Sequence, residues 1–515
     1  MLTGELLHRE WTAFRRPARL IALTVAALIV IAAGLMYAFG NRASCEGPCP
    51  ADPTAADGSI VGDQFWFLHR DLGPEGAITV RMTSMTGTIT YPPPDHDQIV
   101  SGLVPWAKAG IIIKDGVRQG SSYAALMMTG RHGVRMQYDY RHDMAAGEGG
   151  DLTPRFPRWL RLTRSGDTVT GSESADGRRW HIVGTVRLAG LPATAQVGLF
   201  ATSPGDLTLR KVGFGGAIEE SRFTQATGVF DHVTVEGASA GAWRSEAVGE
   251  MNQTDWEKYH NASGAVEKDG VVTVSGTGDI GPSGSEGTGT VERTLSGLVI
   301  MLIIVIVLAA RFGARPDTAV SRLILAARAV VVGAATFVTA LAAVGVVLPV
   351  GVAILSGNGV PVQPVSPLTG VRVVVGTAAV LALCAVLAYG LGVLLRRGWA
   401  AIILALSLVA VPYAVTAFPF LPDVVSQWLL RLTPAAGFAV KQTAVEYPQV
   451  VAHYAPSAGY FPLPGWAGFA VLCAYTLAVV WPAVNRRTPN RRTPGVRPHA
   501  ARGPRTIAGA GPDDG

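Results

Sequence analysis

Long runs without an ionisable residue alternate with charged segments along this chain of 515 residues. The first run ends near Gly40 and the next begins at Thr294, after a long segment of ordinary polar character. Because about 20 apolar residues are needed to cross the hydrocarbon core of a bilayer, these runs predict membrane-spanning helices. The six predicted spans are 20–40, 294–310, 329–355, 373–395, 398–421 and 464–484, the second being the shortest.

Arginine residues gather in alternate connections between the predicted spans. They occur before the first span, after the second, after the fourth and after the sixth, whereas 356–371 and 422–463 are poor in basic residues. Basic loops are retained on the cytoplasmic side of a membrane. We therefore expect a multi-pass protein of the plasma membrane with both termini cytoplasmic and 41–293 extracytoplasmic. The final segment, 485–515, is rich in Arg, Pro and Gly and is expected to be a disordered cytoplasmic tail.

This topology also accounts for the charge balance of the chain. The net charge of +6 and the pI of about 9.2 would by themselves raise nucleic acid as a partner. Most of the excess, however, is arginine beside the apolar runs, as positive-inside topology requires. We therefore expect the lipid bilayer, and not nucleic acid, as the surface that the basic residues meet.

The first residues of the chain have the pattern of a helix that lies on a membrane. Leu7, Trp11 and Phe14 fall at helical spacing, and Arg15 and Arg16 follow at the level of the lipid headgroups. The segment 1–19 is therefore predicted to be a cytoplasmic interfacial helix. The apolar run after it is longer than the 7–15 residues of a signal peptide, so we expect it to be a retained span.

The four cysteines suggest one local crosslink and no metal site. Cys45 and Cys49 follow the first span, and on the extracytoplasmic side they would be positioned to form a small disulfide. Cys384 and Cys473 lie within apolar runs and are interpreted as packing residues. A single C-x3-C pair without nearby His or Cys is too little for a zinc site. No metal and no cofactor is expected in this chain.

The segment 59–235 has the pattern of a β-sandwich, and 236–293 that of a small β subdomain or stalk leading back to the membrane. Short alternating or β-branched runs are separated by turn signals such as Asp115-Gly116 and Asp176-Gly177. The predicted strands are 77–83, 109–114, 123–128, 134–140, 159–164, 168–171, 180–186, 195–201 and 229–235.

Four strings within this segment resemble the concanavalin A-like, laminin G-type sandwich, the DUF1349-like group. They are Trp106–Asp115, Trp159–Asp167, Ser174–Trp180 and Val197–Phe200. The resemblance implies a jelly-roll fold, and members of such folds often bind carbohydrate. Some are glycosidases, and a glycosidase needs two carboxylates in one cleft.

Candidate carboxylates for such chemistry are few. Glu173 falls at a predicted turn, and Asp139 and Asp143 fall in one short stretch, without a pattern that pairs them. We interpret them as solvated loop charges and assign no catalytic residue. The tryptophans of the segment are more simply core residues than sugar platforms.

The membrane half resembles an ABC-2 type transporter permease of the kind common in actinobacteria. The resemblance rests on Leu7–Arg15, on Arg322–Val338, and on six spans with both termini inside. It implies that 311–328 contacts a separate ATP-binding subunit and that the permease pairs with itself or a homologue. The docking residues would be Arg311, Arg315, Asp317 and Arg322.

The chain itself lacks a P-loop. Such a loop ends in Gly-Lys, and none of the six lysines follows a glycine. We therefore expect the permease subunit of an ABC-type exporter, not an enzyme, with ATP bound by the partner. The alternative is a membrane-anchored protein that binds carbohydrate or senses through its β-sandwich.

Overall fold

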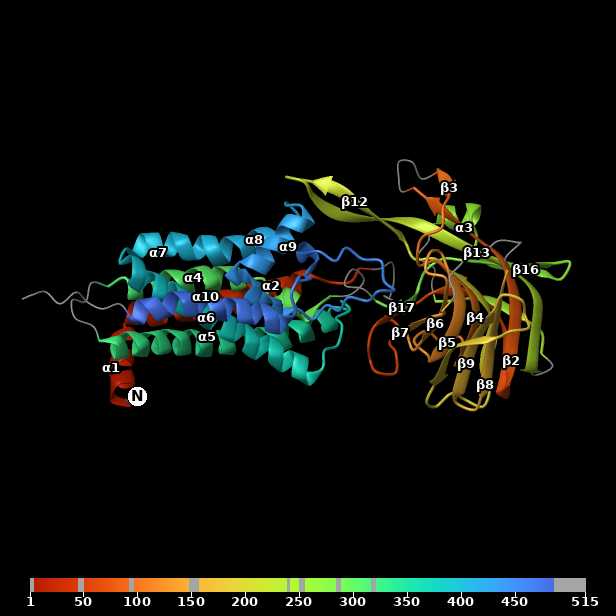
Figure 1. Cartoon of the computed structure of the whole chain (residues 1–515), viewed down its shortest axis with the longest axis horizontal. Helices are drawn as coiled ribbons and strands as arrows, with labels where there is room; N and C mark the ends of the chain where they lie inside the picture. Colours follow the sequence, from red (N-terminus) through yellow and green to blue (C-terminus); the bar gives the residue numbers. More distant parts are fainter. Residues whose placement is uncertain are drawn as a thin grey trace, which may run out of the picture.

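The computed structural model describes residues 4–44, 51–91, 97–147, 157–238, 241–249, 255–283, 289–315 and 321–485. It shows an elongated molecule in which a bundle of helices carries a β domain at one end (Figure 1). The predicted Cys45–Cys49 disulfide and Asp317 lie outside the described residues, and so do 486–515.

Five helices are long and apolar enough to span a membrane. They are α2 (Pro17–Gly40), α5 (Arg322–Gly357), α6 (Pro367–Leu395), the rod Gly398–Thr416 and α10 (Gly465–Asn485). The rod consists of α7 (Gly398–Ala405), a π-helical turn and α8 (Val411–Thr416). The apolar helix expected as the second span, α4 (Leu298–Gly313), has 16 residues and follows a separate 3-10 turn, so it is not among the five.

Two helices begin earlier than their apolar runs. α5 starts at Arg322, where Ser321 accepts a capping hydrogen bond from the Ile324 amide, and α6 starts at Pro367, capped by Ser366. The helix of the fourth expected span, which had no charged residue in its predicted range, therefore includes Arg372 near its N-terminal end. The Arg372 guanidinium donates to the carbonyl of Gln442 at 2.5 Å, outside the apolar part of α6.

The helices pack closely because glycines allow their backbones to approach. α6 is the most buried long helix and contacts α4, α5 and α10. A Cβ on Gly392 of α6 would lie 2.4 Å from the Ala310 carbonyl of α4, and a Cβ on Gly297 would lie 2.8 Å from Val30 of α2. Such small residues set the helix spacing in bundles whose surface is apolar.

The β domain is a sandwich whose two layers share one long strand. That strand, β2 (Phe65–Thr90), pairs through 66–72 with β11 (Ala195–Thr202) and through 75–82 with β8 (Arg158–Ser165). One layer continues from β11 to β4 (Lys108–Lys114), β5 (Tyr123–Thr129), β6 (Val134–Tyr138) and β7 (His142–Ala145). The other continues from β8 to β9 (Thr168–Ser174) and β10 (His181–Arg187). The expected β-sandwich is thus present.

The core lies between the layers. Ile111 and Ile113 of β4 pack with Leu160 and Leu162 of β8, as the alternation of side chains along a strand dictates. Ile112 points to the opposite face and joins a second apolar cluster. The central strands β4 and β5 are therefore buried on both faces, which explains why they read as continuous apolar runs.

In the described part of 236–293, the segment expected to be a small β subdomain or stalk, most strands pair with the main sheet of the sandwich, and the last lies in a separate two-stranded sheet. β14 (Arg244–Val248) pairs with β2, and β16 (Val271–Gly276) pairs with β13 (Gly216–Ala238) and β15 (Gly264–Lys268). β17 (Ile280–Pro282) pairs with β1 (Val61–Asp63). The short helix α3 (Asp255–His260) and strands β3 (Ile99–Ser101) and β12 (Asp206–Val212) complete the domain.

Candidate functional site

The first helix, α1 (Gly4–Phe14), lies crosswise to the bundle at the end opposite the sandwich (Figure 1). It ends because Arg16 precedes Pro17 and takes an extended conformation with ψ of 140°, which directs the chain into α2. Phe14 and Glu10 face the bundle and are buried, whereas Trp11, Arg15 and Arg16 are exposed. Of the two aromatic residues expected on the membrane-facing side of this helix, Trp11 is exposed and Phe14 packs into the bundle.

An aromatic ring at the end of α4 holds this corner together. The Phe312 ring meets Phe14 edge-on at 5.4 Å between centroids. The guanidinium of Arg19 lies 4.7 Å from the Phe312 centroid, that of Arg315 5.0 Å and that of Arg328 5.8 Å. Cations over an aromatic face are attracted by its quadrupole, more strongly where water is excluded. Phe312 therefore gathers arginines from α2, the end of α4 and α5.

Two polar contacts fix α1 within this corner. The Arg328 Nε donates to the Glu10 carboxylate at 2.8 Å, and both side chains are largely buried. Arg19 donates through Nη1 to the carbonyls of Ala13 and Phe14 at the C-terminal end of α1, at 3.1 Å each. We call Glu10, Phe14, Arg19, Phe312 and Arg328 the corner cluster.

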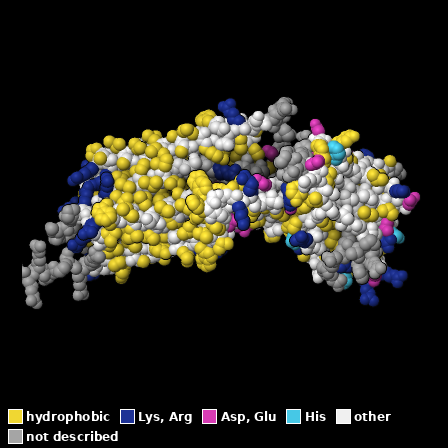
Figure 2. Space-filling view, turned by 90° about the horizontal axis from the view of Figure 1, so that it is seen from above, with side chains coloured by type: hydrophobic (Ala, Val, Ile, Leu, Met, Phe, Trp, Pro, Cys, Tyr) yellow, Lys and Arg dark blue, Asp and Glu magenta, His cyan; other side chains and the backbone are white. Residues whose placement is uncertain are grey.

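Exposed arginines surround the corner cluster. Figure 2 shows Lys and Arg side chains gathered at this end of the bundle, beyond a broad apolar surface that covers the helices. The exposed arginines here are Arg9, Arg15, Arg16, Arg311, Arg322, Arg396 and Arg397.

The residues expected to dock a partner differ in their exposure. Arg311 and Arg322 are exposed, while Arg315 is partly buried over Phe312. The sequence analysis did not predict a role for Phe312 or for the Glu10–Arg328 pair. The signal available was Glu10 itself, an acid one turn before Phe14 on the face that should meet the bundle.

A second contact region joins the opposite end of the bundle to the sandwich. Gln363, between α5 and α6, donates to the carbonyl of Ile60 at 2.8 Å and accepts from its amide at 3.2 Å. The tip of the β12–β13 hairpin reaches the segment after α8, where the Phe214 amide donates to the Phe420 carbonyl at 3.1 Å. The sandwich is therefore anchored to the bundle at separate points.

A histidine lies within this region between two carboxylates from different elements. The His453 ring lies 2.6 Å from Asp423, the first residue of α9 (Asp423–Leu432), and 3.5 Å from Glu219 of β13. Burial lowers the pKa of His453 and raises the pKa of Asp423. The cluster links the hairpin to α9.

The sheet face toward the bundle is closed by the chain itself. Phe65, Phe67, Tyr123 and Phe200 are fully buried there and pack with residues of β1 and β17. A sugar would need such aromatic rings exposed, so this face offers no platform among the described residues. Trp106, also considered as a platform, is buried and stacks on His132 at 4.0 Å.

A buried ion pair fixes the covering segment. The Asp63 carboxylate of β1 accepts hydrogen bonds from Lys114 Nζ at 2.8 Å, the Tyr140 hydroxyl at 2.7 Å and the Gly120 amide at 2.8 Å. Burial lowers the pKa of Lys114 and raises that of Tyr140. The network is enclosed by the protein, since the side chains of Lys114 and Asp63 are both fully buried.

The carboxylates considered for hydrolysis each lie in different local surroundings. Asp143 of β7 pairs with Arg135 and accepts from Gln137 at 3.0 Å, and Asp139 takes a left-handed turn with φ of 45°. The turn expected at Glu173 is wrong. The residue lies within β9, and its side chain is buried. Among the described residues, no three His, Cys, Asp or Glu side chains are grouped to hold a metal ion.

Comparison with known proteins does not identify the chain. No family model matches it, and no curated protein matches it. Solved structures similar over part of the chain include a functionally unknown protein from Saccharomyces cerevisiae, at 15% identity and a TM-score of 0.20 over 37% of this chain and 84% of that one. Another is scytalido-glutamic peptidase, at 7% identity and a TM-score of 0.26 over 42% and 98%. Scores this low establish no common fold.

Proposed function

We propose that this chain is the permease subunit of an ABC-type exporter of the ABC-2 class, driven by a separate ATP-binding subunit. The observation that carries the proposal is the corner cluster. It ties a crosswise helix to the ends of α2, α4 and α5 at one end of the bundle. A partner that moves α1 or the α4–α5 connection would therefore move three long helices together.

The charge pattern supports the same proposal. Exposed arginines at this end provide a surface for an acidic partner, and Arg311 and Arg322 flank the connection that the resemblance assigns to docking. Across the bundle, the sandwich is hydrogen-bonded to the connection between α5 and α6 and to the segment after α8. ATP-induced closure of the partner, acting on two copies of the permease or on a permease and its homologue, would open and close a path between the halves.

The test is co-purification in mild detergent. The tagged full chain from native membranes is expected to carry a P-loop ATPase in stoichiometric amount, identified by mass spectrometry. The double variant Arg311→Glu/Arg322→Glu is expected to lose that partner because it reverses two exposed charges without touching the corner cluster.

A matched control reverses two exposed arginines on the sandwich, Arg178→Glu/Arg179→Glu, and should retain the ATPase. Absence of an ATPase from the unaltered chain in several detergents would overturn the proposal. Such a result would favour the alternative of a membrane-anchored binding or sensing protein, which glycan arrays probed with the full chain would then examine.

A further inference from the structure

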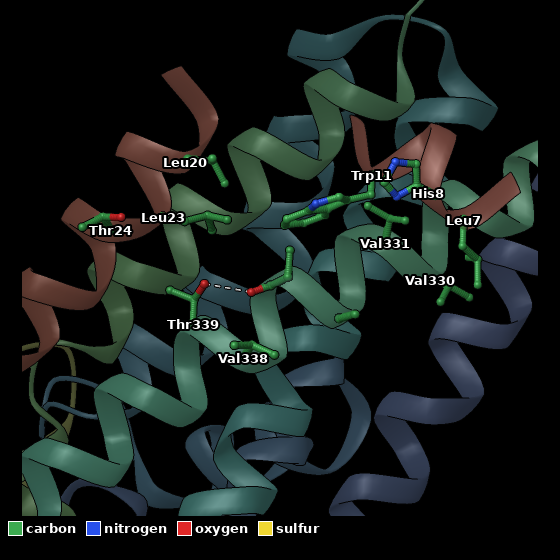
Figure 3. A pocket seen from close by; sticks show the side chains of 12 residues that line it. Leu7, His8, Trp11, Leu20, Leu23, Thr24, Val330, Val331, Val338 and Thr339 are labelled. Atoms are coloured by element: carbon green, nitrogen blue, oxygen red, sulfur yellow. Dashed lines mark hydrogen bonds between the residues drawn. The ribbon is translucent and has the colours of Figure 1, made fainter. Parts of the chain in front are cut away.

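A groove of about 550 Å³ lies between α1, α2 and α5, beside the corner cluster. Figure 3 shows Leu7 and Trp11 of α1, Leu20 and Leu23 of α2, and Val338 of α5 around it. The volume is within the range of about 300–1,000 Å³ that small-molecule sites occupy. It is open on one side, so it is a lateral groove and not an internal cavity.

The lining is almost entirely apolar. One of its hydroxyls, Thr339 Oγ1, donates to the Ala335 carbonyl at 2.8 Å within α5. Water in such a groove would find few partners, because a buried water needs two to four polar groups. A hydrocarbon chain of a ligand, by contrast, would bury apolar surface against this lining, which is favourable.

The chemistry at the corner of the groove is cationic and aromatic. Trp11 is 37% exposed, and an indole is favoured at the boundary between hydrocarbon and headgroups. The Arg15 amide donates to the Trp11 carbonyl at 2.8 Å, so Arg15 lies one turn further along the same face of α1. Arg15 and Arg16 are exposed and form the connection between the two helices that line the groove.

We propose that this groove binds one acyl chain of an anionic phospholipid, with the phosphate held at Arg15 and Arg16. The apolar lining takes the chain, and the arginines at the corner select the headgroup. Each basic residue at an anionic membrane surface contributes about 1 kcal/mol. The site would fix α1 against α2 and α5 through a lipid, and it stands independently of any transport activity.

The experiment is photolabelling of the full chain in vesicles. Phosphatidylglycerol and phosphatidylcholine analogues carry a diazirine on one acyl chain, and labelled peptides are mapped by mass spectrometry. Labelling by the phosphatidylglycerol probe is expected within 7–24 and 330–339, about thirtyfold above that by phosphatidylcholine, the factor that two such arginines supply. Arg15→Gln/Arg16→Gln should remove this preference, whereas Arg396→Gln/Arg397→Gln, exposed at the same end, should keep it.

A second variant tests the groove itself. Ala334→Phe places a ring in the groove from an exposed position of α5, and Ala342→Phe makes the same change at an exposed position of α5 outside it. Labelling should fall in the first and persist in the second, with unchanged gel-filtration profiles.

Three labelling outcomes would overturn the proposal. These are equal labelling of Ala334→Phe and the unaltered chain, equal labelling by the two lipids, and labelling spread over all apolar helices. Disulfide-linked dimers of an Ala334→Cys variant in membranes would overturn it as well, since a second copy would then cover the groove.

Discussion

The Glu10 carboxylate and the Arg328 guanidinium form an ion pair across 318 residues of sequence, with 2.8 Å between Arg328 Nε and Glu10 Oε2. The side chains are 4% and 16% exposed, respectively. The pair joins the crosswise helix α1 to the first turns of α5. It lies beside Phe312, over which the Arg328 guanidinium also lies. The same contact therefore holds α1 in position and gives the Arg328 guanidinium a carboxylate partner.

Removing one member of this pair should loosen α1. Glu10→Ala leaves Arg328 without its carboxylate, and breaking a buried pair costs about 3–5 kcal/mol. We expect a lower unfolding temperature in nanodiscs and faster amide exchange in α1 and the start of α5. Glu5→Ala, an exposed acid on the same helix, is the control. Equal effects of the two changes would contradict a specific role for the Glu10–Arg328 pair.

The buried Asp63–Lys114 pair should be essential for closing the sheet face. Asp63→Asn leaves the Lys114 ammonium buried without a counter-charge, again a loss of about 3–5 kcal/mol. Amide exchange should rise in β1 and β17 and at Gly120, whose amide donates to Asp63. Lys114→Met removes both the charge and its need for a partner, so the double variant should recover part of the loss. No recovery would show that the Asp63 contacts to Tyr140 and Gly120 matter more than the ion pair.

Acid should destabilise the pairing of β2 with β13. Arg81 donates to the Asp231 carboxylate through Nε at 2.7 Å, and this hydrogen bond lowers the pKa of Asp231. A lowered folded pKa means that the stabilisation is present above the unfolded value of about 3.9 and is lost as the pH falls below it. Amide exchange in β2 and β13 should therefore be constant from neutral pH down to about 4 and then increase, after correction for intrinsic exchange rates.

The variant Asp231→Asn should reduce this acid-dependent increase, and Asp269→Asn, at an exposed turn, serves as the matched control. An unchanged acid profile in Asp231→Asn would assign the pH dependence to other carboxylates of the domain.

The hairpin tip should detach when a side chain is added at Gly216. A Cβ there would lie 1.9 Å from the Pro419 carbonyl, so Gly216→Val forces the hairpin away from the segment before α9. Overpacking of this kind costs about 1–3 kcal/mol. Limited proteolysis should then cut within 206–222, whereas Gly264→Val, where a Cβ meets open space, should leave the hairpin protected. Protection in both variants would mean that the tip contact is dispensable.

The sequence predicted the helices and most strands well because each depends on a local pattern. Apolar runs and capping residues decide where α2, α6 and α10 lie, within a few residues. The nine predicted strands all overlap strands of the structure, although 134–140 extends beyond the end of β6 and 180–186 begins one residue before β10. The shared strand β2 was not foreseen as one element, because Gly73-Pro74 reads as a turn. In the structure the strand passes through these residues and changes its partner there, from β11 to β8.

The corner cluster could not be predicted in the same way. Phe312 and Phe14 are apolar residues at helix ends, and nothing local shows that their rings meet. Only the packing of α1 across α4 and α5 brings them together. The β12–β13 hairpin was missed for a related reason, since its tip is supported by the bundle and not by the sandwich core.

The antiparallel pairing of β1 with β17 has a consequence for how this molecule could have arisen. The chain leaves toward the sandwich and returns from it side by side, with Val61 opposite Pro282. Meanwhile α2 and the start of α4 remain in contact, as neighbours joined by a short loop would be. The β domain is therefore a cassette with adjoining ends, which a single insertion event could place in an existing bundle and a single deletion could remove.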